Sequence, residues 1–237
     1  MIALVGSAAL WLGLVTAGYG IGAAVLGVRR REIGLVASAR AAVLIQLAAV
    51  TVAAAALEWA LLDGDFSVRY VALNSSLATP SFYRISGLWA ALEGSILLWE
   101  WMLAGCSAVV VLRYARRHAD LMPYVVVTLL ALSAFFLLVM CLIASPFELL
   151  RPAPADGRGL NPLLENPGMV FHPPALYLGY VGFAIPFAFA LAALATGRVS
   201  ADWITTRRWT VVAWRALTAG IVLGAWWAYR VLGWGGY

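Results

Sequence analysis

The stretch MPYVVVTLLALSAFFLLVMCLI, residues 122–143, contains 22 residues and no charged side chain. An α-helix rises 1.5 Å per residue, so about 20 apolar residues are enough to cross a hydrocarbon core roughly 30 Å thick. The stretch therefore predicts a transmembrane helix. Further spans are expected wherever the chain has an apolar run that meets this standard of length.

Five further apolar runs meet this standard, at residues 2–28, 41–62, 88–112, 175–194 and 209–229. The whole chain is 64% hydrophobic and 11% charged, whereas soluble domains average about 25% charged residues. The runs are continuous and do not alternate with period two, which excludes a transmembrane barrel. We expect an all-α, polytopic transmembrane bundle of about six spans, forming a single transmembrane domain over residues 1–237.

The basic residues are distributed unevenly among the predicted loops. The chain has sixteen arginines, no lysine and a net charge of +5. By the positive-inside rule, the three arginine-rich loops face the cytoplasm. The first span has no basic leader and no small-residue cleavage site, so it is not expected to be a signal peptide. Both termini and the long loops 63–87 and 144–174 are then extracytoplasmic, and no nucleic-acid partner is needed to explain the charge. The arginines of the basic loops are Arg29, Arg30, Arg31, Arg40, Arg113, Arg116, Arg117, Arg198, Arg207 and Arg208.

Four ionisable residues, Glu58, Glu93, Glu100 and Arg215, fall within or at the ends of the predicted spans. Glu93 and Glu100 are seven residues apart and share a helix face. Ionisable groups in hydrocarbon cost at least a few kcal/mol, so they usually face a partner or a cavity. We expect an extended Arg215 to reach Glu100. Two interpretations stay open: a structural ion pair with neutral carboxylic acids, or a polar lining beneath an outer binding pocket.

The second long loop leads into LNPLLENPGMVFHPPALYLGYVG, residues 160–182. Its prolines restrict the backbone, and Pro173 and Pro174 suit the first turn of the fifth span, with His172 just before it. The other histidine, His118, is expected to be solvated in a basic loop. Cys106 and Cys141 lie within apolar runs as packing residues, and without a CxxC motif the chain has neither a redox pair nor a covalent haem site.

This segment resembles the CcmF haem lyase family, whose pattern is LNPLLxxPGxxFHPPxLYLGYVG. The first long loop agrees with the same family in YVA at 70–72, in the residues up to LW at 88–89 and in EGS at 93–95. GAWWAY at 224–229 and the residues to 237 also agree. One departure is Ala90-Ala91, where the family commonly has two glycines. The resemblance covers essentially the whole chain, and it implies the N-terminal part of a larger cytochrome c assembly protein, ending just before a tryptophan-rich haem-handling segment.

The resemblance implies a membrane haem lyase that receives haem from the chaperone CcmE and ligates it to the CxxCH thiols of apocytochrome c. It implies haem b as substrate, a second haem bound by parts outside this chain, and the partners holo-CcmE, CcmG, CcmH/CcmI and apocytochrome c. The expected place is the bacterial plasma membrane, with the functional loops facing the periplasm. No catalytic residue is assigned. The implied haem-binding residues are His172 as axial iron ligand, Trp89 and Trp234 as stacking partners, and Arg84, Arg151 and Arg158 for the propionates.

Simpler roles stay open for these residues, because arginines in loops are commonly solvated and tryptophan favours bilayer interfaces. Two other functions also stay open. One is a haem carrier or channel that makes no covalent bond. The other is a secondary transporter coupled through Glu93 and Glu100, although neither a pair of broken helices nor an internal repeat supports it.

Overall fold

The computed structural model describes residues 1–198 and 203–233, and most of these residues are helical. Six helices are long and apolar enough to cross a membrane, as the sequence predicts. Within the described ranges, strand-like pairing is limited to one bridge between Val68 and Leu149. The predicted all-α bundle is confirmed. The six helices are α1 (Ile2–Arg30), α2 (Ile33–Asp63), α5 (Leu92–Tyr114), α6 (Met122–Leu142), α7 (Pro167–Thr196) and α8 (Trp203–Trp227).

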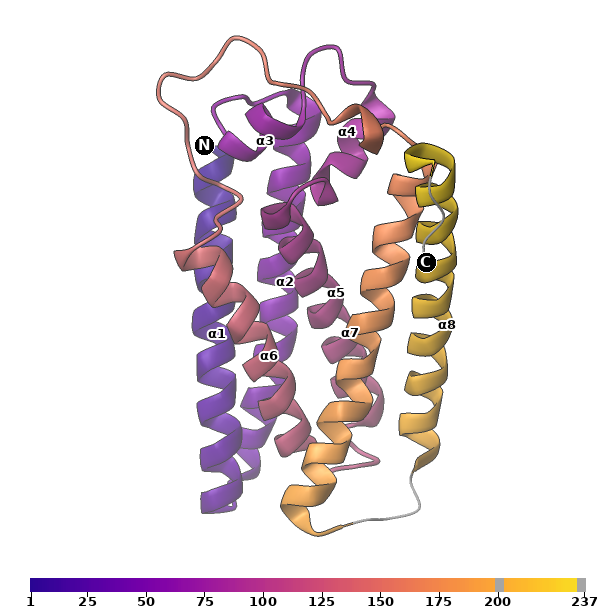
Figure 1. The fold of residues 1–237 in the computed structure, drawn as a ribbon. Coiled ribbons are helices and arrows are strands. Elements are labelled where there is room, and N and C mark those ends of the chain that lie inside the picture. Colours follow the sequence, from indigo (N-terminus) through magenta and orange to yellow (C-terminus); the bar gives the residue numbers. More distant parts are fainter. Residues whose placement is uncertain (199–202, 234–237) are drawn as a thin grey trace.

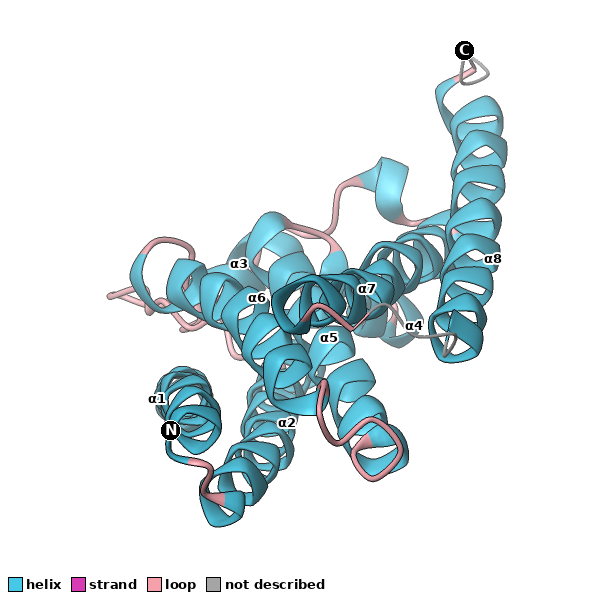
Figure 2. Cartoon of the chain, turned by 90° about the horizontal axis from the view of Figure 1, so that it is seen from below, coloured by secondary structure: helices cyan, strands magenta, loops and turns pink. Residues whose placement is uncertain are grey.

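The helices pack side by side, and α8 stands at the edge of the bundle (Figure 1). Helix α1 packs on α2 and α6, α5 packs on α2, α6 and α7, and α8 packs on α7. Seen along the helices, α6 lies between α1 and α7 (Figure 2). The α7–α8 pair is therefore joined to the rest of the bundle through α7.

Short elements cover one end of the bundle, and the start of α1 and the end of α8 lie at this same end (Figure 1). That both ends of the chain are extracytoplasmic remains a prediction. The covering elements are α3 (Arg69–Asn74), α4 (Ser81–Ser86), the 3₁₀ helices η1 (Gly87–Trp89) and η2 (Pro162–Leu164), and η3 (Ala228–Leu232), a π-helical turn that continues α8.

The first connection is much shorter than the sequence suggests. Residues 29–40 were expected to form a loop, but α2 begins at Ile33 and only Arg31 and Glu32 separate it from α1. Arg31 adopts a left-handed conformation (φ 57°), and the Glu32 amide donates to the Gly27 carbonyl at 2.9 Å. The prediction was wrong because arginines mark where a helix leaves the membrane, which need not be where the helix ends.

The start of α7 also differs from the prediction. The helix begins at Pro167, eight residues before the expected 175, so His172, Pro173 and Pro174 lie inside it. The Asn166 side chain caps the helix by accepting from the Gly168 amide at 2.8 Å. Pro167 fits the first helical position, where no amide donor is needed. Pro173 and Pro174 lack the backbone N–H groups that would donate to the carbonyls four residues earlier. Those carbonyls need other hydrogen-bond donors.

His118 is buried and not solvated, which contradicts the expectation. Its side chain is 6% exposed, with its ring centroid 5.5 Å from that of Phe189 and 6.2 Å from that of Tyr114. The backbone between α5 and α6 folds into tight turns, in which the His118 amide donates to the Tyr114 carbonyl at 2.9 Å. These turns bring the ring back against Phe189 of α7, a contact that the local charge pattern did not indicate.

Candidate functional site

His172 lies on the face of α7 that meets α8, close to the covered end of the bundle. Its Nδ1 is 2.7 Å from the carbonyl oxygen of Gly220 on α8. A carbonyl only accepts, so Nδ1 carries a proton, and in the neutral form of the ring the lone pair is on Nε2. The lone pair of Nε2 is then available, and Nε2 makes no hydrogen bond with any described residue. A neutral imidazole whose other nitrogen donates to a backbone carbonyl is the usual arrangement of a histidine that binds a metal.

Gly224 makes room for this imidazole. A Cβ atom there would overlap the His172 ring, at 2.7 Å from Nδ1 and 3.0 Å from Nε2. Gly220, one turn earlier, lies so close to α7 that a Cβ would stand 2.6 Å from the Leu176 Cα. Small residues four apart allow two membrane helices to approach until their backbones touch. The Gly220–Gly224 pair therefore determines how deeply His172 sits between the helices.

The same close packing continues along the pair in an antiparallel register. Gly179 of α7 faces Leu217 of α8, where a Cβ would stand 2.5 Å from the Leu217 amide, and Gly182 faces Ala213. At the other end, Gly168 faces Trp227. Gly220 and Gly224 have the GxxxG spacing, which is visible in the sequence and is typical of close helix contacts in membranes. It was the signal that could have identified α8 as the partner of His172.

Trp227 extends the site on the same side of α8. Its ring is nearly parallel to the His172 imidazole, with an interplanar angle of 13° and centroids 6.5 Å apart. Its indole Nε1 is buried and has no hydrogen-bond partner among the described residues. A buried N–H without an acceptor costs free energy, on the order of 1–3 kcal/mol. This donor next to His172 is therefore available to an acceptor that the described chain does not supply.

Trp89 supports the turn of α7 that precedes His172. Its indole N–H donates to the Met169 carbonyl at 2.9 Å. In a regular helix that carbonyl would accept from residue 173, but Pro173 has no amide hydrogen. The contact explains how α7 tolerates a proline in its second turn. The hydrogen bond to Met169 also gives Trp89 a structural role. That Trp89 stacks on haem remains a prediction.

The residues of the EGS motif hold Trp89 in place. The Ser95 hydroxyl donates to the Trp89 carbonyl at 3.0 Å. Gly94 packs against the Tyr70 ring, where a Cβ would stand 2.7 Å from Cζ. The Tyr70 hydroxyl lies 2.8 Å from the Gly87 carbonyl and 3.0 Å from the Leu88 carbonyl. Burial raises the pKa of Tyr70, so the phenol stays protonated and keeps donating.

The two long loops that carry the motifs pack on each other. Arg69 pairs with Glu148 at 3.1 Å, beside the bridge between Val68 and Leu149. Further along, the Arg158 amide donates to the Ala72 carbonyl at 2.8 Å. Segments about 80 residues apart thus form one cap over the His172 end of the bundle.

The predicted propionate ligands differ in their availability. Arg84 donates to three backbone carbonyls, those of Leu62, Leu77 and Thr79, at 2.9–3.2 Å. The Arg84 guanidinium therefore stabilises the backbone of the cap, and each of its nitrogens already donates. The side chains of Arg151 and Arg158 are exposed. Trp234, the other predicted stacking residue, lies outside the described residues.

Glu100 is fully buried, but its partner is not Arg215. The Gln46 side-chain amide donates to Glu100 Oε1 at 3.2 Å, and the Ser133 hydroxyl lies beside the same carboxyl group. Arg215 is exposed on α8, which packs on α7 and so does not bring this arginine to α5. The predicted ion pair is wrong because the register of the helices, not the depth of the residues, decides which side chains meet.

The other two predicted acids lie nearer the covered end. Glu93 is in the first turn of α5, where it lines a small hollow of about 110 Å³ with Arg69 and Asn74. Glu58 is partly buried in the last turns of α2. Neither has a hydrogen bond to His172, so the structure does not join the acids and the histidine into one polar site.

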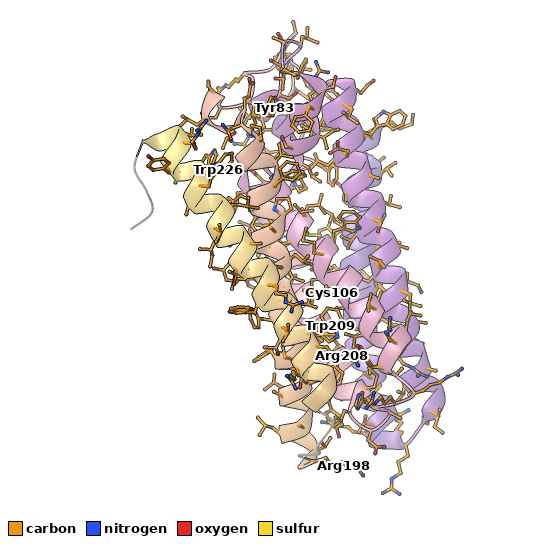
Figure 3. All side chains as sticks on the ribbon, turned by 90° about the vertical axis from the view of Figure 1, so that its right-hand side faces the viewer. Tyr83, Cys106, Arg198, Arg208, Trp209 and Trp226 are labelled. Carbon is orange, nitrogen blue, oxygen red and sulfur yellow. The ribbon has the colours of Figure 1, made fainter. Side chains whose placement is uncertain are left out.

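Toward the middle of the bundle, Trp99 of α5 lies among the aromatic rings of α6 and α7. Its ring is 5.7 Å from Tyr180 at an angle of 13°, and 5.4 Å from Tyr177. Cys106 is buried nearby in the same helix as a packing residue (Figure 3). Trp99, Phe136 and Tyr180 also line an apolar hollow of about 310 Å³ among α5, α6 and α7.

Comparison with known proteins supports the resemblance. The family described as cytochrome C assembly protein matches residues 89–237. Among curated relatives, the cytochrome c-type biogenesis protein CcmF of Pseudomonas aeruginosa is 44% identical, covering 100% of this chain and 36% of that protein. The probable cytochrome c-type biogenesis protein NrfE of Escherichia coli is 39% identical over 89% of this chain and 38% of its own length.

A solved structure titled cytochrome c heme lyase CcmF shares the fold. It superposes with a TM-score of 0.87 and 40% identity over all of this chain and 38% of its own chain. The chain thus spans little more than a third of the length of the proteins it matches. The family match covers more than half of the chain, including His172 and the α7–α8 pair. The chain therefore belongs to the cytochrome c assembly protein family and is of the CcmF type.

Proposed function

We propose that this chain forms part of a membrane haem lyase, in which His172 binds the iron of the haem that is to be attached to apocytochrome c. The carrying observation is the bond from His172 Nδ1 to the Gly220 carbonyl, which leaves the Nε2 lone pair for a metal. The family supports a role in cytochrome c maturation.

The proposed reaction adds the S–H of each CxxCH cysteine across a haem vinyl group. One vinyl carbon forms the bond to sulfur and the other receives the hydrogen, so the reaction needs no oxidant or reductant. The main requirement is that the vinyl groups are held facing the thiols. His172 would fix the iron, and the partnerless Trp227 indole N–H offers a donor to an acceptor group such as a propionate. Arg151 and Arg158 are exposed cations at the same covered end.

The proposed assembly lies in the bacterial plasma membrane with the covered end of the bundle facing the periplasm. The gathering of arginines at the opposite end supports this orientation. Haem b would arrive on CcmE, and CcmG and CcmH/CcmI would present the apocytochrome. We further propose that the second iron ligand and a second haem belong to parts of the protein outside this chain.

Replacing His172 by alanine in the full-length protein tests the proposal. Reconstitution with holo-CcmE and an apocytochrome is scored by covalent haem on the cytochrome. We expect the product to fall by more than about 100-fold, because even residues that only orient a metal ligand contribute roughly 10–100-fold. Phe171→Ala is the matched control, since Phe171 is an exposed neighbour on α7.

Both variants should elute and unfold like the parent protein. Normal yield of covalent product from His172→Ala would refute the assignment. If the parent protein binds haem and returns it without forming a thioether, the protein is a carrier and the lyase proposal fails.

A further inference from the structure

A crevice lies among α1, α6 and α7 at the end of the bundle opposite His172. It has a volume of about 490 Å³, within the range of small-molecule sites. Helix α6 lies between the other two helices (Figures 1 and 2) and contributes Pro123, Tyr124, Val127 and Thr128 to the lining. Ala24 is fully buried and Leu191 is 39% exposed, so the crevice extends from the interior to the surface. Its lining residues are Ala24, Val25, Val28, Arg29, Pro123, Tyr124, Val127, Thr128, Leu191 and Ala195.

The crevice combines an apolar interior with two hydrogen-bond donors. Thr128 is its deepest polar residue on α6, and the Thr128 hydroxyl is used within the helix by donation to the Tyr124 carbonyl at 3.0 Å. The guanidinium of Arg29 and the phenol of Tyr124 make no hydrogen bond with any described residue. Arg29 is in the last turn of α1 and is exposed, so the charge lies at the mouth.

A neighbouring hollow of about 460 Å³ shares Val28 and Pro123 but differs in charge. Its two arginines are accompanied by two acids, and one of these, Asp120, pairs with Arg198. The α1–α6–α7 crevice has a cation and no carboxylate among its lining residues. Arg198 and Arg208 lie at this same end, far from Trp226 and Tyr83 (Figure 3). Of these two hollows, the α1–α6–α7 crevice is therefore the one that suits an anion.

We infer that the α1–α6–α7 crevice binds an anionic phospholipid. The acyl chain lies against the apolar walls, and the phosphate accepts from Arg29 and Tyr124. Basic pockets between transmembrane helices on the cytoplasmic side are suited to such headgroups. A free phosphate would leave the apolar walls in water, and a purely apolar ligand would leave both donors unpaired.

The test measures lipid binding to the full-length protein by native mass spectrometry after delipidation, with palmitoyl-oleoyl phosphatidylglycerol as the probe. The parent protein should retain one tightly bound phosphatidylglycerol. Arg29→Gln should weaken this binding about fivefold, as expected for one basic residue near an anionic headgroup, and Tyr124→Phe should weaken it further in the double variant. Ala195→Phe should reduce the binding without a change of charge.

Arg30→Gln is the matched control, because Arg30 is the next residue, is exposed and is not among the lining residues. Phosphatidylcholine with the same acyl chains distinguishes the headgroup from the chains, and inorganic phosphate distinguishes a lipid from a free anion. Equal weakening by Arg29→Gln and Arg30→Gln, equal affinity for phosphatidylcholine, competition by millimolar phosphate alone, or no retained lipid would each overturn the inference.

Discussion

His172 and Glu100 are both polar side chains at an interface between apolar helices, and they differ in how accessible their unpaired atoms are. Glu100 is fully buried beside Gln46 and Ser133 among α2, α5 and α6, and its Oε2 has no hydrogen-bond partner among the described residues. His172 uses one nitrogen to bind α8 and keeps the other free near the end of the bundle. Burial of a polar group in a membrane protein is thus a poor guide to function by itself. A fixed lone pair on a side chain that is partly exposed, as in His172, is a better one.

The strongest test of this difference, after His172→Ala, is Gly224→Ala. The new methyl group would overlap the imidazole, so the ring must move away from the Gly220 carbonyl. We expect covalent haem product to fall at least about tenfold, the lower end for residues that orient a metal ligand. The measurement is the reconstituted ligation assay together with the absorption spectrum of bound haem.

Gly22→Ala is the matched control for this variant, because nothing lies within 4 Å of a Cβ at that position of α1. It should leave both the product and the spectrum unchanged. A parent-like spectrum in Gly224→Ala would mean that the glycine does not position the imidazole.

A smaller effect is expected from Trp89→Phe. Phenylalanine keeps an aromatic ring but leaves the Met169 carbonyl without its donor. A hydrogen bond contributes about 1 kcal/mol net, which is roughly a fivefold change in an equilibrium. If its loss loosens the start of α7 by this amount, we expect roughly a fivefold loss of product. Hydrogen exchange of residues 167–172 should increase in the same variant.

Trp101→Phe provides the comparison, since the Trp101 indole donates to the Thr51 hydroxyl at 3.0 Å, away from α7. Equal losses of product in both variants would show that the effect is general and does not pass through Met169.

The smallest effect is expected from Glu100→Gln. The carboxamide keeps the shape of the carboxyl group and can still bond to Gln46, so haem ligation should be unchanged. Interhelical hydrogen bonds in membranes average about 0.6 kcal/mol, and the free energy of unfolding should change by no more than about 1 kcal/mol. A tenfold loss of product would contradict the structural role of Glu100 and would favour the polar lining that the sequence left open.

The sequence predicts the six spans well because each depends only on a continuous apolar run of sufficient length. The run at 122–143 matches α6 to within one residue. The sequence predicts the ends of helices less well. Pro173 and Pro174 were expected to begin a helix, yet Trp89, some 80 residues away, allows α7 to begin at Pro167.

By itself, the sequence determined that the chain is a six-span bundle, that its motifs are of the CcmF type and that His172 is the residue to examine. Only the tertiary structure decided that Gln46 and not Arg215 meets Glu100, that Arg84 is bound to backbone carbonyls, and that Gly220 sets the protonated nitrogen of His172. The physical reason is that apolar length is a local property of the chain. A hydrogen-bond partner depends on the register between helices that are distant in the sequence.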